Sequence, residues 1–341
     1  MDEVSRGGAA GTAEVRPIRP DDAPMITQLV ERCYADGYHK DVMYRPDELA
    51  GMIRSGSHNG VVAEAEGMVV GHMAYLWPNE NATVVEAGIT VVDPGWRGKG
   101  IMGRLAVAMG EMLAAGGAIG FVHYPTTAHE VMQRASLSSG GRETGIMLAF
   151  LPPETRDHSI AEGGDQRLAV TVVYQPILKS KPQAIFVPGR FEELLLGLAE
   201  ELGLERTAAQ PLRDPAGDTL LEVSPDASPG LEHIRVARIG TDVADRVTSS
   251  LAESDARVVH VDLPMNDPGI DYAAGQLKPA GFAYSAWLPC WDGHDVLRLQ
   301  RIAEPSPLEL NPSLFSPEAG SLMEVIRPDL PGSASASTMR P

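Results

Sequence analysis

The sequence predicts a mixed α/β protein that is built from two domains. Its 341 residues exceed the usual length of one small domain and suit two. Segments with strand-like and helix-like hydrophobic periodicity alternate in both halves of the chain. Between the halves, the polar stretch 152–166 contains Pro152, Pro153, Gly163 and Gly164. These turn-forming residues predict a linker.

The expected domain limits follow changes in composition. Residues 1–12 are rich in Gly and Ala, and we expect them to be disordered. The first domain is expected at 13–152, the linker at 153–167 and the second domain at 168–304. Residues 305–341 are expected to form a loop-like C-terminal extension.

The acidic composition restricts which partners the chain attracts. It has 28 Lys and Arg against 46 Asp and Glu, a formal charge of −18. Such a chain repels the phosphates of nucleic acids and anionic membranes, so neither is an expected partner. A cationic small molecule such as an amine would be attracted, although acidity that only maintains solubility is the commoner reading.

Cysteine usage and hydropathy indicate a reduced, cytoplasmic protein. The two cysteines, Cys33 and Cys290, lie far apart and lack the spacing of a zinc or redox motif. One long-range disulfide between them stays open as an alternative. Residues 1–14 have no signal-peptide core, and no apolar run approaches the ~18–20 residues that span a membrane.

The first half predicts its elements in a clear order. Apolar alternation indicates strands, apolar spacing of three and four indicates helices, and Gly or Pro ends each element. We expect an extended stretch at 15–20, a helix after Asp21 and Asp22, a helix at 46–54, a hairpin at 61–65 and 68–76, a strand at 83–92, a helix at 101–115, a strand at 118–123, a helix at 128–138 and a strand at 145–151.

The second half shows the same kinds of pattern. We expect it to begin with strands at 168–173 and 184–187, followed by a helix at 190–202, a loop over 207–230, a strand at 234–239, a helix at 242–253, a strand at 258–263, a helix at 272–278 and strands at 282–288 and 296–302.

The most informative segment is a glycine-rich turn between a strand ending at Asp93-Pro94 and a helix. Glycines let backbone amides converge on an anion, and a helix start adds unpaired N–H groups and a favourable dipole. The spacing is neither that of a P-loop nor that of a dinucleotide-binding fold. The turn therefore predicts a site for a pyrophosphate or a similar anion. Its residues are Arg97, Gly98, Lys99, Gly100, Ile101, Met102 and Gly103.

This turn resembles the GNAT superfamily motif Arg/Gln-x-x-Gly-x-Gly/Ala, which follows a strand ending in proline. Arg97 and Gly100 match, whereas Met102 replaces the final Gly or Ala and Gly103 follows one step later. The order of elements over 15–151 is also similar to that of a GNAT acyltransferase. The resemblance implies a mixed, mostly antiparallel twisted sheet flanked by helices.

The resemblance also implies the co-substrate, acetyl-CoA or another acyl-CoA. Thr90, Val91 and Val92 would line the acyl and pantetheine path, and residues 97–103 would hold the pyrophosphate. Backbone amides and a cationic side chain would supply the positive field, so no metal ion is implied.

Glu86 is the leading candidate for the catalytic base. Acylation of an amine by a thioester needs a neutral amine, a donor to the carbonyl oxygen and a proton for the leaving thiolate. Glu86 lies four residues before Thr90 on the strand that enters the site, and carboxylates on this strand often act as base in GNAT enzymes. A purely structural carboxylate is an equal alternative.

The position of the family's usual proton donor is altered. That donor is a Tyr four residues before a Gly-Phe pair; here the count from Gly140 gives Ser136, and Gly141 replaces the Phe. His129 replaces an Asn seven residues before Ser136. Ser136 can donate a hydrogen bond but is a poor acid. His129 is a candidate proton donor, although a hydrogen-bonded or surface histidine is commoner than a catalytic one.

Three residues are candidates for the acceptor side: Tyr38, Tyr44 and His72. By resemblance, the loop between the first two helices lines the acceptor pocket. Packing is an equal alternative for both tyrosines.

The second half resembles the last third of a GNAT domain at Val258–Pro264 and at Ala280-Gly281-Phe282, where the Gly-Phe pair is intact. It has no Arg-x-x-Gly-x-Gly turn. The chain is thus similar to tandem proteins that join an acyl-CoA-binding GNAT domain to a degenerate partner. It would act as a monomeric pseudo-dimer or as a homodimer.

The sequence favours an acyl-CoA-dependent N-acyltransferase that transfers directly to a small amine or amino-acid-like acceptor. Two alternatives remain: a catalytically impaired, CoA-binding regulatory protein, and an acyltransferase acting on oxygen or hydroxylamine. Acceptor identity and acyl chain stay open.

Overall fold

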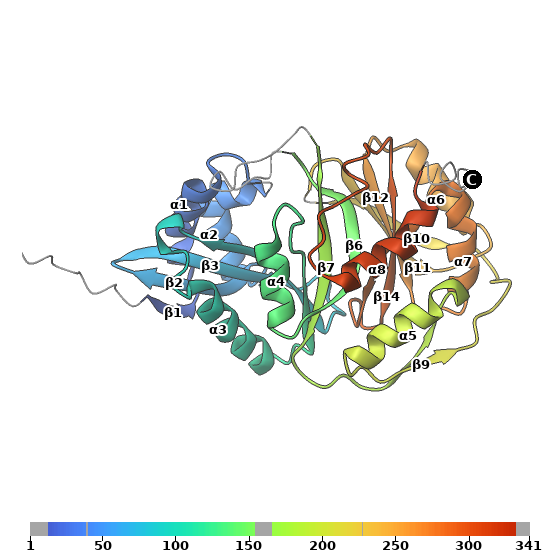
Figure 1. The fold of residues 1–341 in the computed structure, drawn as a ribbon, viewed down its shortest axis with the longest axis horizontal. Helices are drawn as coiled ribbons and strands as arrows, with labels where there is room; N and C mark the ends of the chain where they lie inside the picture. The colour runs from blue at the N-terminus through green and yellow to red at the C-terminus, as the bar shows by residue number, and fades with distance from the viewer. Residues whose placement is uncertain (1–12, 39, 154–165, 227, 332–341) are drawn as a thin grey trace, which may run out of the picture. The chain divides into compact units, whose positions relative to one another are not determined.

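The computed structural model describes residues 13–38, 40–153, 166–226 and 228–331, and these fall into two compact units (Figure 1). The first unit contains 13–76 and 87–113, and the second contains the other described residues. The expected disordered segment 1–12 and most of the expected linker lie outside the described residues. The division into two successive domains at 153–167 stays a prediction.

The first unit combines antiparallel strands with two packed helices. Its strand order is β1 (Glu14–Pro17), β2 (Asn59–Ala65), β3 (Met68–Leu76) and β4 (Val84–Val92), of which residues from Ala87 onward belong to this unit. Helices α1 (Ala23–Tyr34) and α2 (Pro46–Ser55) bury their apolar stripes in one core with these strands. Helix α3 (Ile101–Ala115) follows β4 and begins at the expected residue.

The α1 sequence shows why this core forms. Ile26, Leu29, Val30 and Cys33 recur at helical spacing and are almost completely buried. Asp22 precedes the helix, but its carboxylate binds the guanidinium of Arg16 at 2.8 Å and accepts the Arg19 N–H at 2.7 Å. The expected cap therefore acts by tying the helix start to β1.

The second unit contains a sheet whose strand order is nearly symmetrical. The order runs from the first residues of β4 through β5 (Gly120–His123), β7 (Leu168–Pro176), β6 (Arg142–Leu151), β13 (Ala283–Leu288), β14 (Val296–Ile302), β12 (Val258–Pro264) and β11 (Leu231–Arg238) to β10 (Leu220–Pro225). Neighbours are parallel in β4/β5 and β11/β12 and antiparallel elsewhere. The mixed, mostly antiparallel class that the sequence predicts is confirmed.

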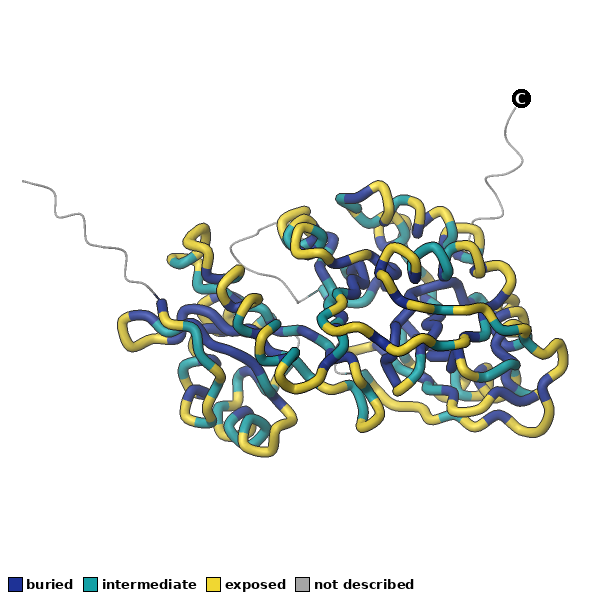
Figure 2. Tube along the Cα trace, turned by 90° about the horizontal axis from the view of Figure 1, so that it is seen from below, coloured by how far each residue is buried: buried dark blue, intermediate teal, exposed yellow. Residues whose placement is uncertain are grey.

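Helices cover this sheet, and a small parallel pair lies beside it. The helices are α4 (Glu130–Ser138), α5 (Glu192–Glu201), α6 (Val243–Ala252), α7 (Ile270–Leu277) and α8 (Pro317–Ile326), and the pair is β8 (Gln183–Phe186) with β9 (Arg206–Ala209). Short 3-10 turns lie at Pro20–Asp22, Asp41–Tyr44, Pro94–Trp96, Gly189–Phe191, Lys278–Ala280 and Arg327–Asp329. Figure 2 shows buried segments along the strands and exposed segments in the connections.

In the middle of this strand order, β6 and β13 approach each other closely. Gly145 pairs with Ala286, and a Cβ on Gly145 would lie 2.1 Å from the Ser285 carbonyl oxygen. Only glycine permits this approach. Beyond that pair the Gln300 side chain joins the two strands: it donates to the carbonyls of Ile146 and Tyr284, at 2.9 Å each.

Two expectations about elements were wrong. The expected loop 207–230 contains β10, an edge strand. Its side chains are largely exposed, so its sequence shows no alternation of buried apolar and exposed polar residues. The expected loop-like extension contains α8, capped by Ser316 and buried through Leu322 and Ile326. The strand expected at 168–173 is present as β7, which pairs with both β5 and β6.

Candidate functional site

The glycine-rich turn starts from a rigid corner at the end of β4. The Asp93 carboxylate accepts the Gly95 N–H at 2.9 Å, which caps the 3-10 turn Pro94–Trp96. Arg32 from α1 reaches the other Asp93 oxygen at 2.7 Å, and the Asp93 N–H donates to the Val70 carbonyl at 2.9 Å. Contacts to α1 and β3 therefore fix where the following residues begin.

The turn presents a row of backbone amides. Gly98 and Gly100 have φ angles of 73° and 72°, which favour glycine. The first helical bond of α3 runs from the Arg104 N–H to the Gly100 carbonyl at 3.2 Å. For the N–H groups of 98–103, the described part of the chain supplies no acceptor. Residues 98–100 are exposed, and a Cβ on Gly98, Gly100 or Gly103 would meet no atom within 4 Å.

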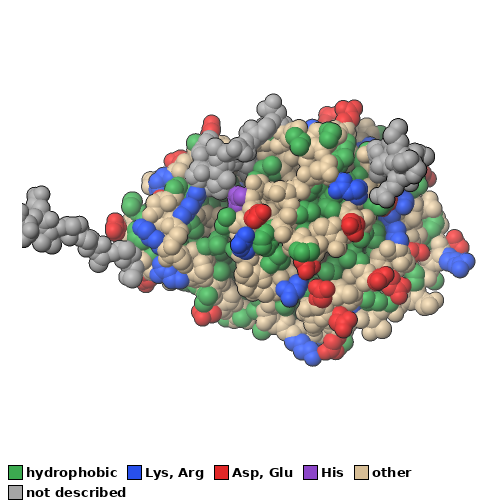
Figure 3. Space-filling view, viewed as in Figure 1, with side chains coloured by type: hydrophobic (Ala, Val, Ile, Leu, Met, Phe, Trp, Pro, Cys, Tyr) green, Lys and Arg blue, Asp and Glu red, His purple; other side chains and the backbone are tan. Residues whose placement is uncertain are grey.

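Basic side chains accompany these amides. Arg97 is exposed and donates from Nε to the Val92 carbonyl at 3.2 Å. The Lys99 ammonium lies 4.4 Å from the centre of the Trp96 ring. Arg104 points elsewhere, since its Nη1 donates to the Ala13 carbonyl at 2.8 Å. The chain is strongly acidic overall, and Figure 3 shows acidic and basic side chains interspersed on the visible face. Arg97 and Lys99 therefore make the turn locally basic on a chain whose net charge is negative.

The strand before the turn has an irregularity that the sequence does not signal. Val91 is buried, whereas Thr90 and Val92 keep part of their surface exposed. Ile89 adopts a φ of 56°, an uncommon conformation for a β-branched residue. Such a residue re-aims the strand next to a site, as a bulge does.

Glu86 lies where the pairing of β4 with β5 ends. Its Cα partner is Val122, the last paired position, and β4 continues to Val92. Glu86 is partly exposed, and its negative charge contributes to a raised pKa at Tyr124. Glu86 belongs to the second unit and the turn to the first, because the boundary between the units falls within β4 after Glu86.

Two residues, His123 at the end of β5 and Tyr124 directly after it, were not singled out from the sequence. Desolvation raises the pKa of Tyr124 well above its usual value, and the charge of Glu86 adds to this effect. His123 is uncharged at neutral pH because burial lowers its pKa to about 4. Its Nδ1 is buried and has no partner among the described residues. Both residues lie at the end of the strand whose Val122 pairs with Glu86, and a titratable residue in that position is the signal that could have identified them.

The Ser136 hydroxyl is already hydrogen-bonded within α4. Its Oγ donates to the Met132 carbonyl at 2.8 Å, one turn earlier in α4, and the residue is buried. Its proton is therefore already engaged. His129 occupies the N-cap position of α4, and its buried Nδ1 has no partner among the described residues. Both catalytic roles stay predictions.

The acceptor-side candidates are largely interior. Tyr38 is buried in the α1–α2 core. Its ring centre lies 4.8 Å from that of Tyr34 in a tilted contact, and its backbone N–H donates to the Tyr44 hydroxyl at 2.8 Å. Tyr44 is partly exposed, and desolvation raises its pKa. These contacts agree with the packing alternative, while a substrate role stays a prediction.

His72 forms a buried pair with His58 inside the first unit. The His72 Nδ1–H donates to the Val61 carbonyl at 3.0 Å, so Nε2 is the acceptor for His58 Nε2–H at 3.1 Å. Burial lowers the pKa of His72 to about 4 and that of His58 to about 3. Both rings are therefore neutral at pH 7, and both nitrogens of His72 are engaged.

A charged cluster from the second half of the chain lies on the sheet of the second unit. Arg298 on β14 binds Asp262 on β12 with two hydrogen bonds of 2.7 and 2.9 Å, and His233 on β11 approaches the same carboxylate at 2.8 Å. The sequence analysis did not identify this cluster, because its members are 29 to 65 residues apart and no local spacing joins them.

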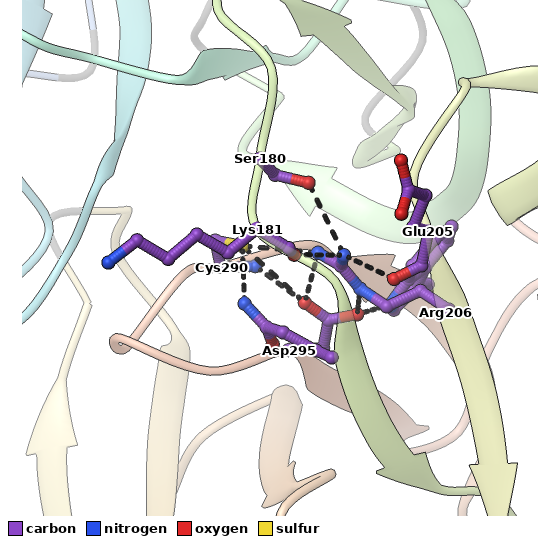
Figure 4. A network of polar contacts seen from close by, with 8 residues as sticks. Ser180, Lys181, Glu205, Arg206, Cys290 and Asp295 are labelled. Atoms are coloured by element: carbon purple, nitrogen blue, oxygen red, sulfur yellow. Dashed lines mark hydrogen bonds and ion pairs between the residues drawn. The ribbon is translucent and has the colours of Figure 1, made fainter.

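A second buried network surrounds Arg206 (Figure 4). Arg206 binds Asp295 at 2.8 and 3.1 Å and contacts the Cys290 sulfur at 3.2 Å, with Ser180 at 3.3 Å. Burial raises the pKa of the Cys290 thiol to about 11. Cys33 and Cys290 are both free thiols, so the disulfide alternative is not realised. This network ties β9 to β14 and has the character of a structural tie.

The described residues hold neither a candidate metal site nor a membrane-spanning helix. They contain no cluster of three His, Cys, Asp or Glu side chains arranged to hold a metal ion. None of their helices combines the length and hydrophobicity needed to cross a membrane.

Comparison with known proteins finds similarity in solved structures alone. No protein-family model matches the sequence, and no curated protein matches it. An N-acetyltransferase from Staphylococcus aureus Mu50 is similar at 17% identity and a TM-score of 0.38, over 48% of this chain and 98% of that one. A GNAT superfamily phosphinothricin acetyltransferase from Sinorhizobium meliloti, in complex with acetyl-CoA, is similar at 21% identity and a TM-score of 0.40, over 50% and 94%.

A third similar structure is a ribosomal-protein-alanine N-acetyltransferase from Brucella melitensis. Its identity is 20% and its TM-score 0.38, over 48% of this chain and 99% of that one. This chain is thus similar, over about half of its length, to nearly complete N-acetyltransferases.

Proposed function

We propose that the protein is an acyl-CoA-dependent N-acyltransferase with acetyl-CoA as the simplest donor. The observation that carries this proposal is the row of amides over 98–103, which have no acceptor within the described chain, beside glycines where a Cβ would meet no atom within 4 Å. A pyrophosphate satisfies such donors, because it offers several acceptor oxygens and a negative charge that the start of α3 favours.

The resemblance of the turn to the GNAT motif supports a coenzyme A pyrophosphate over other anions. Arg97 and Lys99 supply two cations beside the amides. Gly103 leaves the first turn of α3 without a side chain where the family has Gly or Ala one position earlier. A bulky anion can therefore approach the helix start closely.

In this proposal Glu86 accepts a proton from the acceptor amine. The amine attacks the thioester carbonyl directly, the C–S bond breaks, and coenzyme A leaves as the thiol. Glu86 suits this role because it is partly exposed and lies on the strand that leads into the turn. The acidic surface favours the approach of a cationic acceptor.

Binding and turnover are tested separately. Isothermal titration with acetyl-CoA should show one site per chain, and Arg97→Ala should weaken binding by about tenfold, as expected for loss of one charged contact. Turnover of acetyl-CoA with a panel of small amines should fall about 10²-fold or more in Glu86→Gln, while acetyl-CoA affinity is retained. Absence of acetyl-CoA binding would overturn the proposal.

One observation favours a second candidate, a CoA-binding protein without catalysis. The hydroxyl proton of Ser136, at the position of the family's usual acid, is engaged with Met132. This candidate predicts acetyl-CoA binding with no turnover for any amine in the panel. Turnover that is abolished by Glu86→Gln would exclude it.

A further inference from the structure

Asp93 places a carboxylate directly before the glycine-rich turn of the first unit. It is the only acidic residue of the sequence between Glu86 and Glu111. One of its oxygens, Oδ1, accepts the Gly95 N–H at 2.9 Å and so shapes the start of the turn. A negative charge at this place repels a pyrophosphate that binds to the turn. The group that shapes the turn therefore opposes the anion unless its charge is compensated.

Arg32 supplies the compensating charge from the last turn of α1. Its Nε donates to Asp93 Oδ2 at 2.7 Å, so the pair uses the oxygen that Gly95 leaves available. Its Nη2 donates to the Val69 carbonyl on β3 at 2.9 Å. The Arg32 side chain is 37% exposed and that of Asp93 18%. One planar guanidinium thus holds a carboxylate and a carbonyl together, which a lysine ammonium does not do in the same way.

The position of the turn is fixed by further contacts that do not involve Arg32. At its beginning, the Asp93 N–H donates to the Val70 carbonyl at 2.9 Å. At its end, α3 packs against β3 at Gly71, where a Cβ would lie 2.8 Å from Ile101 Cγ2. Neighbouring residues of β3 therefore support both ends of the turn. Loss of Arg32 changes the charge beside the turn more than the place of its backbone.

We propose that Arg32 is a positioning residue of the coenzyme A site, which acts through Asp93. It neutralises the carboxylate, so that Asp93 caps the turn without repelling the pyrophosphate. This inference rests on the coenzyme A binding proposed above, and it requires no contact between Arg32 and the co-substrate.

Arg32→Ala and the double variant Arg32→Ala/Asp93→Asn test the compensation by calorimetry with acetyl-CoA. Arg32→Ala leaves an uncompensated carboxylate, and we expect the Kd to rise about fivefold. The double variant should return to within about twofold of the wild-type Kd, because asparagine keeps an acceptor for the Gly95 N–H but carries no charge. A purely structural role predicts that the double variant binds no better than Arg32→Ala. The difference between Arg32→Ala and wild type should also disappear in 1 M NaCl, where the Debye length is about 3 Å.

Asp93→Asn by itself keeps the proposal testable if Arg32→Ala fails to fold. With Arg32 retained and the carboxylate removed, acetyl-CoA should bind about two- to threefold more tightly. Arg16→Ala is the matched control, because Arg16 binds Asp22 of the same unit with two hydrogen bonds of 2.8 Å. It should lower the thermal stability and leave the Kd unchanged.

Three results would overturn the role of Arg32 while the proposed function stands. They are a wild-type Kd in Arg32→Ala, a double variant as weak as Arg32→Ala, and weaker binding in Asp93→Asn. A wild-type protein that does not bind acetyl-CoA would overturn both proposals.

Discussion

The turns that follow β4 and β11, one strand from each parallel pair β4/β5 and β11/β12, differ in whether their backbone N–H groups have acceptors. After β4, the amides of 98–103 have no acceptor among the described residues. After β11, the Ile239 N–H donates to Asp267 at 2.9 Å, the Gly240 N–H to the Thr219 hydroxyl at 3.0 Å and the Thr241 N–H to the Gly217 carbonyl at 3.1 Å. The second turn is therefore satisfied by the protein itself.

Packing and charge also close the second turn to an anion. A Cβ on Gly240 would lie 2.4 Å from the Gly217 carbonyl oxygen, so a neighbouring loop occupies the space that is open at Gly98 and Gly100. The carboxylates of Asp267 and Asp242 accept backbone hydrogen bonds there. A strand, a turn and a helix are therefore not enough to leave backbone amides without an acceptor. The groups that pack around the turn decide whether its N–H donors are filled.

The carboxylates on the two strand pairs differ in their exposure to solvent. Glu86 is partly exposed on β4. Asp262 on β12 is buried and held by Arg298 and His233. Burial by itself would raise the pKa of Asp262, but the charge and hydrogen bonds of Arg298 hold it far below its usual value. Asp262 is part of a buried ion pair, whereas the role of Glu86 as a base is part of the function proposed above.

The largest expected effect comes from breaking that ion pair. Asp262→Ala leaves Arg298 buried without its partner, and we expect a loss of about 3–5 kcal/mol in the free energy of unfolding. Urea denaturation measures it. Asp41→Ala, which removes an exposed pair with Arg45, is the control and should cause no measurable change. A cost below about 1 kcal/mol for Asp262→Ala would contradict the role we assign to the pair.

Acidification should destabilise both strand pairs through buried neutral histidines. Burial lowers the pKa of His123 on β5 to about 4 and holds that of His260 on β12 well below its usual value. The unfolded chain binds these protons more readily, so stability falls as the pH drops below about 6.5. Each histidine contributes a slope of about 1.4 kcal/mol per pH unit.

Replacing either ring should flatten this dependence. His260→Leu and His123→Leu are each expected to remove one such slope between about pH 6.5 and 5, measured by denaturation at a series of pH values. Curves parallel to that of the wild type would show that the ring binds protons equally well in the folded and unfolded protein.

Adding a methyl group to the first turn should weaken acetyl-CoA binding. Gly100→Ala places a Cβ at a φ of 72°, which costs about 1–2 kcal/mol in stability and obstructs the amide row. We expect the Kd for acetyl-CoA to rise about tenfold. Gly217→Ala has a φ of 77° and equally open surroundings, so it carries the same strain but should leave the Kd unchanged. Equal effects of both substitutions on the Kd would remove the distinction between the turns.

The smallest expected effect is on acetyl-CoA binding when a glycine of α3 is replaced by alanine, and two such glycines distinguish binding from helix stability. Gly103→Ala and Gly110→Ala both place a methyl group in open space and should each stabilise the helix by about 1 kcal/mol. Only Gly103→Ala should raise the Kd for acetyl-CoA, by about threefold, because Gly103 lies in the first turn. Thermal denaturation and calorimetry test the two halves of this prediction. If Gly110→Ala weakens binding as much, the anion does not lie at the helix start.

Local patterns predicted most elements but failed where burial or distance decided. Helix α3 was predicted at its observed limits, because apolar spacing and the bounding glycines are local properties. Strand β10 was missed because an exposed edge strand shows no apolar alternation. Tyr124 was missed because its relation to Glu86 depends on the register of two strands that are distant in the sequence.

The sequence by itself determined the class of the fold, the glycine-rich turn and its position between a strand and a helix. These depend on side-chain periodicity and on the backbone freedom of glycine, which act over a few residues. Tertiary structure alone decided that β7 lies between β5 and β6, that Asp262 is neutralised by Arg298, and that the turn after β11 is filled. Each of these depends on groups brought together by the folded chain, so no local pattern carries them.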